Sequence, residues 1–545
     1  MERRFILAIG LMLLIALIPG ILWPPKPAPL QPASQADTAA AIAATTNGPP
    51  VTQVQPGSPP VRPPAASAET VWVTTPLARL GFSSHGAQLV RAELLQYQSF
   101  APGDAARRVQ LIPDARPLLG LKLVVDKDTL ALADWDFTPS TRTLAVNGPG
   151  SVVTFSAQRG GVEVAITYTF DAASYRFGVR GRVTGLGPQG AVLVLGMGDG
   201  LRSVEGDSVD DYRHFAVVTK ASKSERKDFG SLKTGDVAVM NGPFEWAGVK
   251  SKYFLVAALA LQENQPQFAG AVAVGGERSG KFATRAALAL TLPVPPSGEF
   301  RYDLLAGPLE YRTLAKLGHD LDDANPYGWI FRPIVKPVSV LVVNILLWVH
   351  EHLHLAYGWV LVAFGMLIRL LLWPLNQKAM ESQMRMAVVQ PIVQEIQAKH
   401  KNDPEKLQKE MMRVYKEHNV NPLGGCLPML LPWPVLLALF FVFSNTIEFR
   451  GVPFLWLPDL SRADPLHIIP VLLGLSMFVL SKVGQKGVPP NPQMKTMTYF
   501  LPVMMTMLFF RLASGLNLYY LVSNIASIPQ QWLIAQKRLR QQGKT

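Results

Sequence analysis

The segment His350-Glu351-His352-Leu353-His354 has the His-Glu-x-x-His spacing of zinc proteases. In that motif, two histidines one helical turn apart bind the metal and the glutamate acts as a general base. A catalytic zinc needs a third protein ligand, usually an acid, but the apolar runs that follow contain no Asp or Glu in their interiors. We favour a cluster of interfacial histidines at the end of a short helix, with an intramembrane metalloprotease as the alternative.

Arg369 interrupts an apolar run, residues 358–373, that is nearly long enough to cross a bilayer. An arginine at such a depth costs roughly 2.5 to 3.5 kcal/mol on insertion scales, so its side chain should face protein or a water-filled cavity. The alternative is that Arg369 lies near the cytoplasmic end of its span and extends its guanidinium to the interface. The first interpretation makes Arg369 a candidate functional residue.

Cys426 is the single cysteine, which excludes an intrachain disulfide framework and a cysteine-based zinc cluster. It follows Leu423-Gly424-Gly425 and so mimics a lipoprotein acylation box. That box functions just after an N-terminal signal, whereas this one lies in the middle of the chain, so we interpret Cys426 as a residue at a helix start. The sequence has no Walker-type loop, and we predict neither an enzyme nor a cofactor.

The composition is that of a membrane protein with a substantial polar part. The chain has 545 residues, of which 49% are hydrophobic and 17% charged, against roughly 25% charged residues in soluble domains. The net charge is +13, from 52 Lys and Arg against 39 Asp and Glu. Because the basic residues gather at the ends of apolar runs, they indicate membrane topology and not specific nucleic-acid binding.

Residues 1–69 predict a membrane anchor followed by a tether. Glu2-Arg3-Arg4 precedes an apolar run that ends at Trp23, and no small-x-small cleavage site follows. We therefore predict a retained anchor over residues 1–23 with a cytoplasmic N-terminus. Residues 24–69 are rich in Pro and Ala, with few charged or large apolar residues, and predict a disordered linker.

Residues 70–307 predict an all-β domain. Residues 162–170 and 175–183 alternate between apolar and polar types, as half-buried strands do. The second segment places Arg176, Arg180 and Arg182 on one face. Turn residues at short intervals predict a large antiparallel sandwich, in which we find no catalytic constellation.

The remainder predicts membrane helices. Residues 308–349 should form connecting and interfacial helices, because the apolar segment 338–349 is too short to span a bilayer. Residues 350–375 should hold the second span with Arg369. Four further apolar runs, 426–447, 466–480, 497–510 and 516–534, lie within residues 426–536 and bring the prediction to six spans.

The charges of the connecting segments give the orientation. The loop 481–496 carries Lys482, Lys486 and Lys495 without an acid, and the tail 537–545 is also basic. The positive-inside rule then places both segments, residues 376–425 and both termini in the cytoplasm. The β domain lies on the opposite side.

Residues 376–425 predict a cytoplasmic hairpin of two helices. Asn376 is a plausible N-cap of the first helix, and Asp403-Pro404 starts the second. In one interpretation, the apolar stripes of the two helices only pack on each other. In the other, the hairpin also offers exposed methionines such as Met386 and Met412 as a surface for apolar clients. The two stripes contain Met380, Met384, Val388, Ile392 and Ile396 on the first helix, and Leu407, Met411, Val414 and Tyr415 on the second.

Four motifs carry a family resemblance: Trp373-Pro374-Leu375, Asn421-Pro422-Leu423-Gly424-Gly425-Cys426, Ser514-Gly515-Leu516 and Tyr519-Tyr520. With the anchor, the β domain and Arg369 in this order, the chain resembles the YidC membrane protein insertases of Gram-negative bacteria, in the YidC/Oxa/Alb family. The resemblance covers essentially the whole chain. It implies a periplasmic β-supersandwich and a membrane α-helical, five-helix insertase core with a cytoplasmic helical hairpin, in the bacterial inner membrane.

The resemblance also implies the function. The chain would insert and fold inner-membrane proteins, alone or with the Sec translocon, through a hydrophilic groove that carries one arginine. Its expected partners are nascent membrane proteins, the Sec translocon, the ribosome and membrane lipids. A zinc metalloprotease and a passive transporter or channel remain the alternatives. The groove residues implied are Arg369, Leu427, Leu430, Trp433, Leu436, Met504, Met505, Leu508, Tyr519 and Tyr520.

The chain departs from the family's pattern at two places, Pro432-Trp433-Pro434 and Arg511-Leu512-Ala513. Together with Pro428, the prolines lie in the first turns of the third span. They predict a kinked start of that helix.

Overall fold

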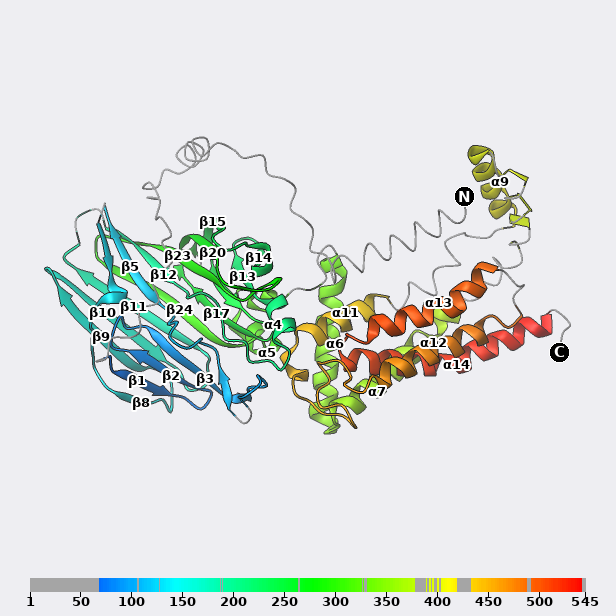
Figure 1. Ribbon diagram of the computed structural model, residues 1–545, viewed down its shortest axis with the longest axis horizontal. Coiled ribbons are helices and arrows are strands. Elements are labelled where there is room, and N and C mark those ends of the chain that lie inside the picture. The colour runs from blue at the N-terminus through cyan, green and yellow to red at the C-terminus, as the bar shows by residue number, and fades with distance from the viewer. Residues whose placement is uncertain are drawn as a thin grey trace. The chain divides into compact units, whose positions relative to one another are not determined.

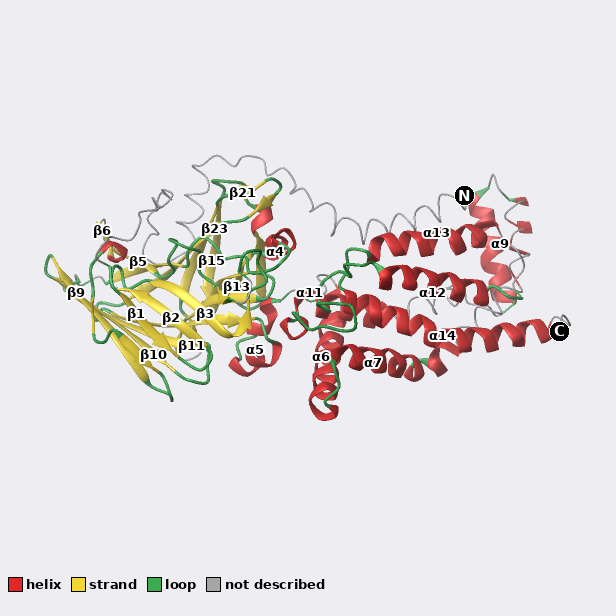
Figure 2. Cartoon of the chain, turned by 60° about the horizontal axis from the view of Figure 1, so that its bottom comes forward, coloured by secondary structure: helices red, strands yellow, loops and turns green. Residues whose placement is uncertain are grey.

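The computed structural model describes residues 68–541, with gaps at 105–106, 127, 187, 189, 263–264, 326, 328–330, 378–388, 390–391, 394, 397–398, 401–402, 419–432 and 488–491. Residues 60–378 and 428–545 belong to one compact unit, and residues 379–427 to another. The larger unit holds a β-rich domain followed by a helical region (Figures 1 and 2). The predicted anchor and most of the linker lie outside the described residues.

Three sheets form most of the β-rich domain (Figure 1). The five-stranded sheet has the order β4 (Arg108–Gln110), β3 (Leu89–Gln98), β2 (Ala78–Ser83), β1 (Thr70–Thr74), β8 (Thr143–Ala145). The nine-stranded sheet has the order β14 (Ser224–Asp228), β13 (Ala216–Lys220), β16 (Trp246–Lys250), β17 (Phe254–Leu259), β24 (Glu299–Pro308), β11 (Arg176–Thr184), β10 (Val162–Phe170), β9 (Ser151–Arg159), β7 (Thr138–Pro139). The six-stranded sheet has the order β15 (Val237–Phe244), β20 (Phe268–Gly275), β23 (Ala286–Val294), β12 (Ala191–Gly196), β5 (Gly120–Val125), β6 (Asp128–Ala131). Two short hairpins complete it, β18 (Leu261–Gln262) with β19 (Gln265–Pro266) and β21 (Arg278–Ser279) with β22 (Phe282–Ala283).

Strands β10 and β11 coincide closely with the two segments predicted from alternation. Their apolar side chains point to one face, where Ile166 and Tyr168 are fully buried. Tyr168 packs against Phe82 of the five-stranded sheet, with ring centroids 4.6 Å apart. The alternate residues, including Thr167 and Arg180, lie on the other face of the sheet. The alternation therefore encodes a sheet with one buried face, and the β-rich domain is confirmed.

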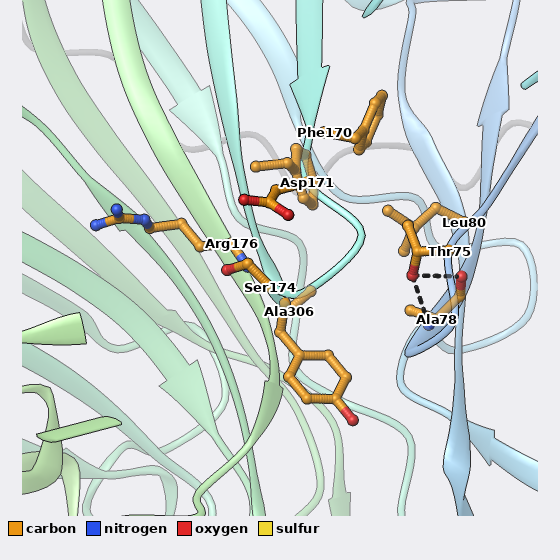
Figure 3. Close-up of a pocket in the computed structure, with 10 residues that line it drawn as sticks. Thr75, Ala78, Leu80, Phe170, Asp171, Ser174, Arg176 and Ala306 are labelled. Carbon is orange, nitrogen blue, oxygen red and sulfur yellow. Dashed lines mark hydrogen bonds between the residues drawn. The ribbon is translucent and has the colours of Figure 1, made fainter. Parts of the chain in front are cut away.

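Figure 3 shows a small pocket beside the turn that joins β10 to β11. Its polar side chains are engaged in local turns. Thr75 accepts a hydrogen bond from the backbone N–H of Ala78 (2.9 Å), and Asp171 accepts one from Ala173 N–H (2.9 Å). These contacts fix the pocket walls and leave little polar chemistry for a ligand.

A buried carboxyl group makes the β-rich domain sensitive to pH. Asp211 lies on α4 (Ser208–His214), where it accepts hydrogen bonds from Ser203 Oγ (2.7 Å) and Lys252 N–H (3.0 Å). Burial, with a contribution from Glu205, nevertheless raises the pKa of Asp211 to about 7. Between about pH 4 and pH 7 the folded state thus binds more protons than the unfolded state, and stability falls as pH rises through this window.

We therefore expect Asp211→Asn to remove this part of the pH dependence. An upward shift of this size corresponds to at most roughly 4 kcal/mol, so the full chain should lose stability from pH 5 to pH 7.5 more steeply than the variant does. Thermal unfolding of both proteins at the two pH values measures the difference. Parallel slopes would show that Asp211 ionises as it does in the unfolded chain.

The helical region contains α5 (Tyr311–Leu317), α6 (Arg332–Leu353), α7 (Tyr357–Leu371), α11 (Trp433–Asn445), α12 (Ile468–Gly484), α13 (Pro492–Phe509) and α14 (Ser514–Gln541). Among the described residues, α6 is the helix that is long and apolar enough to cross a membrane. The shorter apolar helices there are Tyr357–Leu371, Pro434–Asn445, Ile468–Gly484 and Thr498–Phe509. The count of six spans therefore stays a prediction.

Helix α6 corrects the prediction of a short segment over residues 338–349. It has 22 residues, because a polar first part precedes the apolar run. Pro333 lies in the first turn, where proline is tolerated, and Lys336 pairs with Asp322 (3.1 Å). Both views show α6 running across the direction of α7, α12 and α14 (Figures 1 and 2).

The Ser514-Gly515 motif fixes the start of α14. The backbone N–H groups of Ser514 and Gly515 donate to the carbonyls of Arg462 (2.7 Å) and Leu460 (2.9 Å). A Cβ on Gly515 would lie 2.4 Å from the ring of Phe443 in α11, so only glycine allows this approach. The motif therefore joins α14 to α11 and to the segment before α12.

The second unit contains α9 (Pro404–Glu417). The side chain of Asp403 accepts a hydrogen bond from Lys406 N–H (3.1 Å), as expected for an N-cap. Val414 and Tyr415 pack against Val389 and Val393 of the preceding segment. Much of the first predicted helix, with Met380, Met384, Met386 and Val388, lies outside the described residues, so the complete hairpin remains a prediction.

Candidate functional site

Arg369 lies in the last turn of α7. Its side chain is half-buried, and its Nε is buried without a hydrogen-bond partner among the described residues. Its charge interacts electrostatically with the phenol groups of Tyr519 and Tyr520, which lie on α14. Gly365, one turn earlier, faces α14, since a Cβ there would lie 3.2 Å from Val522 Cγ1 and 3.4 Å from the carbonyl oxygen of Tyr519. The structure thus places a cation in the neighbourhood of two tyrosines and, in the part of the chain described, pairs it with no acid.

Polar side chains of α14 extend this environment, although sequence analysis did not single them out. Asn524 donates to Ser476 Oγ of α12 (3.2 Å). Gln530 accepts from Asn376 Nδ2 (2.7 Å) and donates to the carbonyl of Trp373 (3.1 Å), just after α7. The available sequence signal was the recurrence of Asn517, Asn524, Ser527 and Gln530 at intervals of seven and three residues, which places them close to one face of a helix.

The structure brings several of the predicted groove residues together. Leu436 of α11 and Met505 of α13 pack against the same buried cluster as Tyr519 and Tyr520. The ring of Tyr520 stacks on Phe509, with centroids 5.6 Å apart. Met504 and Leu508 are half-buried on α13. The remaining three are not placed: Leu427 and Leu430 lie outside the described residues, as does the side chain of Trp433.

Apolar side chains are exposed on the same helices. On α7 they include Leu367, Leu370 and Leu371, which flank Arg369 in sequence, and on α13 they include Phe500 and Val503. Leu367, Leu370 and Leu371 are three and four residues apart, so they share one exposed face of α7, and such a face marks contact with lipid or with another protein. Arg369 is four residues after Gly365 and lies on the other side of the helix, toward α14.

A buried ion pair joins the β-rich domain to the segment after α11. Arg450 Nε lies 2.8 Å from Glu205 Oε1, and both side chains are less than a tenth exposed. Its guanidinium also lies over the ring of Phe100 (4.2 Å) and donates to the carbonyl of Gln98 (2.9 Å). Sequence analysis missed this contact, because its partners are 245 residues apart.

Two family models match the chain. That of the YidC periplasmic domain matches residues 70–341, and that of the 60Kd inner membrane protein matches residues 348–542. The membrane protein insertase YidC of Oleidesulfovibrio alaskensis is 33% identical over 531 residues, which cover 94% of this chain and 95% of that protein. The chain belongs to the YidC family.

A second YidC insertase, from Cupriavidus metallidurans, is 31% identical over 521 residues, which cover 91% of this chain and 88% of that protein. Among solved structures, that of an active YidC insertase with its first transmembrane domain resolved covers 86% of this chain and 93% of its own, with 17% identity and a TM-score of 0.35. Family membership makes the β-rich domain periplasmic and the protein an inner-membrane protein.

Neither the comparisons nor the geometry supports the zinc-protease alternative for this YidC-family chain. Helix α6 ends at Leu353, and His354 has a left-handed backbone (φ 51°), so the two outer histidines of the motif do not share a regular helical turn. His350 stacks on Tyr357, and Glu351 forms an ion pair with Arg312. Among the described residues, no group of three His, Cys, Asp or Glu side chains is placed to hold a metal ion.

Proposed function

We propose that this chain inserts membrane proteins into the bacterial inner membrane and that Arg369 attracts the polar tail of the client. The observation that carries the proposal is the position of Arg369. It is a half-buried cation whose Nε has no hydrogen-bond partner among the described residues, near two tyrosines and the polar face of α14. A cation that has no acidic partner in the described part of the protein is available to an acidic group from outside. No covalent step and no nucleotide are needed.

Insertion transfers the client's polar tail and its apolar segment from water into the membrane. A client tail with Asp or Glu loses hydration when it leaves water, and a nearby guanidinium offsets part of that cost. The apolar segment of the client gains roughly 25 cal/mol per Å² of surface removed from water as it enters lipid. Leu436, Met504, Met505 and Leu508 would form the side of the path that this segment follows.

The membrane topology and the delivery partners belong to the same proposal. We infer six spans with both termini in the cytoplasm, a five-helix core and a cytoplasmic hairpin over residues 376–425. Nascent membrane proteins would be the clients, with the Sec translocon and the ribosome as partners in their delivery. The basic segments 481–496 and 537–545 support this orientation.

A reconstituted insertion assay tests the proposal. The purified chain is placed in liposomes, and a single-span client with a short acidic tail is added with and without purified Sec translocon. We expect protease protection of the tail in both cases, and none with empty liposomes. If the client remained fully accessible with and without translocon, the proposed activity would be wrong.

The hairpin should be required for client capture. We expect a deletion of residues 379–425, bridged by a short Gly/Ser linker, to abolish crosslinking to the client, because the segment offers exposed side chains such as Met412. The deletion leaves Asn376, which bonds Gln530, in place. An intermediate control replaces only Met412 by Gln and should retain most of the capture.

Hydrogen exchange gives a second measurement on the hairpin. Most side chains of α9 are exposed, so its amides should exchange faster than those of α12 and α14. Equal protection in α9 and α14 would count against a hairpin that moves to receive clients.

A further inference from the structure

Two arginines face each other in the middle of the nine-stranded sheet. Arg180 of β11 is directly opposite Arg301 of β24 in antiparallel register, and both side chains are exposed. Opposed Cβ atoms in such a pair are about 4.5 to 5.5 Å apart, and like charges placed there destabilise the sheet. The position is therefore unfavourable unless something outside the sheet neutralises it.

The neighbouring arginines on this face do have acidic partners. Arg182 pairs with Glu299, which is directly opposite it (2.5 Å), and Arg176 lies 3.7 Å from Asp303. Among the described residues, neither Arg180 nor Arg301 forms such an ion pair. The arginines on either side of the Arg180–Arg301 pair thus each have a carboxylate partner, whereas Arg180 and Arg301 have none among the described residues.

Two threonine hydroxyl groups lie next to the arginine pair, on the two neighbouring strands of the same face. Thr167 of β10 is opposite Arg180, and Thr154 of β9 is opposite Thr167, with their hydroxyl oxygens 3.0 Å apart. Gly178 lies two residues from Arg180 on the same face, and a Cβ there would lie 3.5 Å from Asp303 Oδ1, so the carboxylate that Arg176 contacts fills the space beside Gly178. The site therefore combines two exposed guanidinium groups and a hydroxyl group on one face of the sheet.

We propose that Arg180, Arg301 and Thr167 bind a phosphoryl group on the outer face of the periplasmic sheet. Each guanidinium can donate two parallel hydrogen bonds, so two of them match the several oxygens of a tetrahedral anion better than the two oxygens of one carboxylate. The binding would also relieve the repulsion between the arginines. This site does not depend on the insertion activity.

The position along the strand favours a soluble source of the phosphoryl group. Arg301 lies seven residues before Pro308, the end of β24 from which the chain continues to the helices. At about 3.4 Å per residue the separation along the strand is roughly 24 Å. A soluble phosphate compound can reach such a site freely, whereas a phospholipid headgroup in the same bilayer would have to extend to it.

Binding can be measured on the full chain in detergent at constant ionic strength. Inorganic phosphate is titrated against chloride, and the shift in the unfolding temperature and the heat of binding are recorded. We expect saturable binding by the unmodified chain, and at least tenfold weaker binding by Arg180→Gln and by Arg301→Gln. The matched control Arg182→Gln alters an arginine on the same strand that already has an acid partner, and should bind phosphate as the unmodified chain does.

Two further results complete the test. Without phosphate, Arg301→Gln should be at least as stable as the unmodified chain, because it removes a like-charge pair, and this keeps loss of binding distinct from misfolding. Short-chain phosphatidylglycerol below its micelle concentration tests the lipid source, and tighter binding of it than of phosphate would assign the site to lipid. The proposal would be overturned if both glutamine variants bound phosphate as tightly as the unmodified chain does. It would also be overturned if chloride shifted the unfolding temperature of the unmodified chain as much as phosphate does.

Discussion

Replacing Arg369 by alanine should reduce insertion of a client with an acidic tail about 30-fold, and insertion of a client with a neutral tail much less. A unit charge roughly 8 Å from a carboxylate, at an effective dielectric constant of about 20, contributes about 2 kcal/mol, which is about 30-fold in an equilibrium constant. The measurement is insertion of one client with zero, one or two tail acids. The alanine defect should grow with each acid.

The charge, and not the shape of the side chain, should decide the outcome. Lysine at position 369 should work fairly well, because a long-range attraction needs no fork geometry, whereas glutamate should repel acidic tails and favour basic ones. Arg511→Ala, at an exposed position in the turn after α13, is a matched control that should leave all clients unaffected. If the defects of the Arg369 variants followed protein stability and ignored tail charge, Arg369 would have a structural role only.

The sequence predicted the features that depend on local pattern. Strands β10 and β11 followed from period-two alternation, because one face of the sheet is buried and the other is not. Arg369 was found because a charge within an apolar run is rare enough to identify by type alone. The strongly amphipathic α9 and its N-cap Asp403 were likewise predictable from spacing.

Features that depend on distant partners were not predictable. The polar face of α14 was overlooked because single amides in an apolar run carry little signal until their partners, such as Ser476 and Trp373, are in place. The length of α6 was underestimated because its polar first part is stabilised by Asp322 and Asp323, outside the apolar run. The opposition of Arg180 and Arg301 depends on the register of two strands separated by more than 100 residues.

The Arg450 contact shows why the boundary of a deletion matters. Removing one partner of a buried ion pair leaves an uncompensated charge and costs roughly 3 to 5 kcal/mol. Glu205→Ala should therefore lower the stability of the full chain measurably. Removing the whole domain instead exposes Arg450 to water, where it needs no partner.

Deleting residues 70–308 should leave insertion largely intact, whereas deleting residues 70–349 should abolish it. The first deletion ends with β24, which must be removed completely because it lies between β17 and β11. The second also removes α6, whose Val343 and Leu346 are buried in one cluster with Leu439 of α11. Inside a membrane such packing is a main source of helix association, so α11 should lose its position without α6.

Both deletions keep residues 1–69, so the anchor and linker are matched between them. Insertion of a single client is compared at equal amounts of protein in the membrane, and limited proteolysis reports whether α11 to α14 remain protected. We expect protection and insertion together for the shorter deletion and loss of both for the longer one. Loss of insertion by the shorter deletion, with protection of the helices retained, would assign an essential role in insertion to the periplasmic domain itself and not to α6.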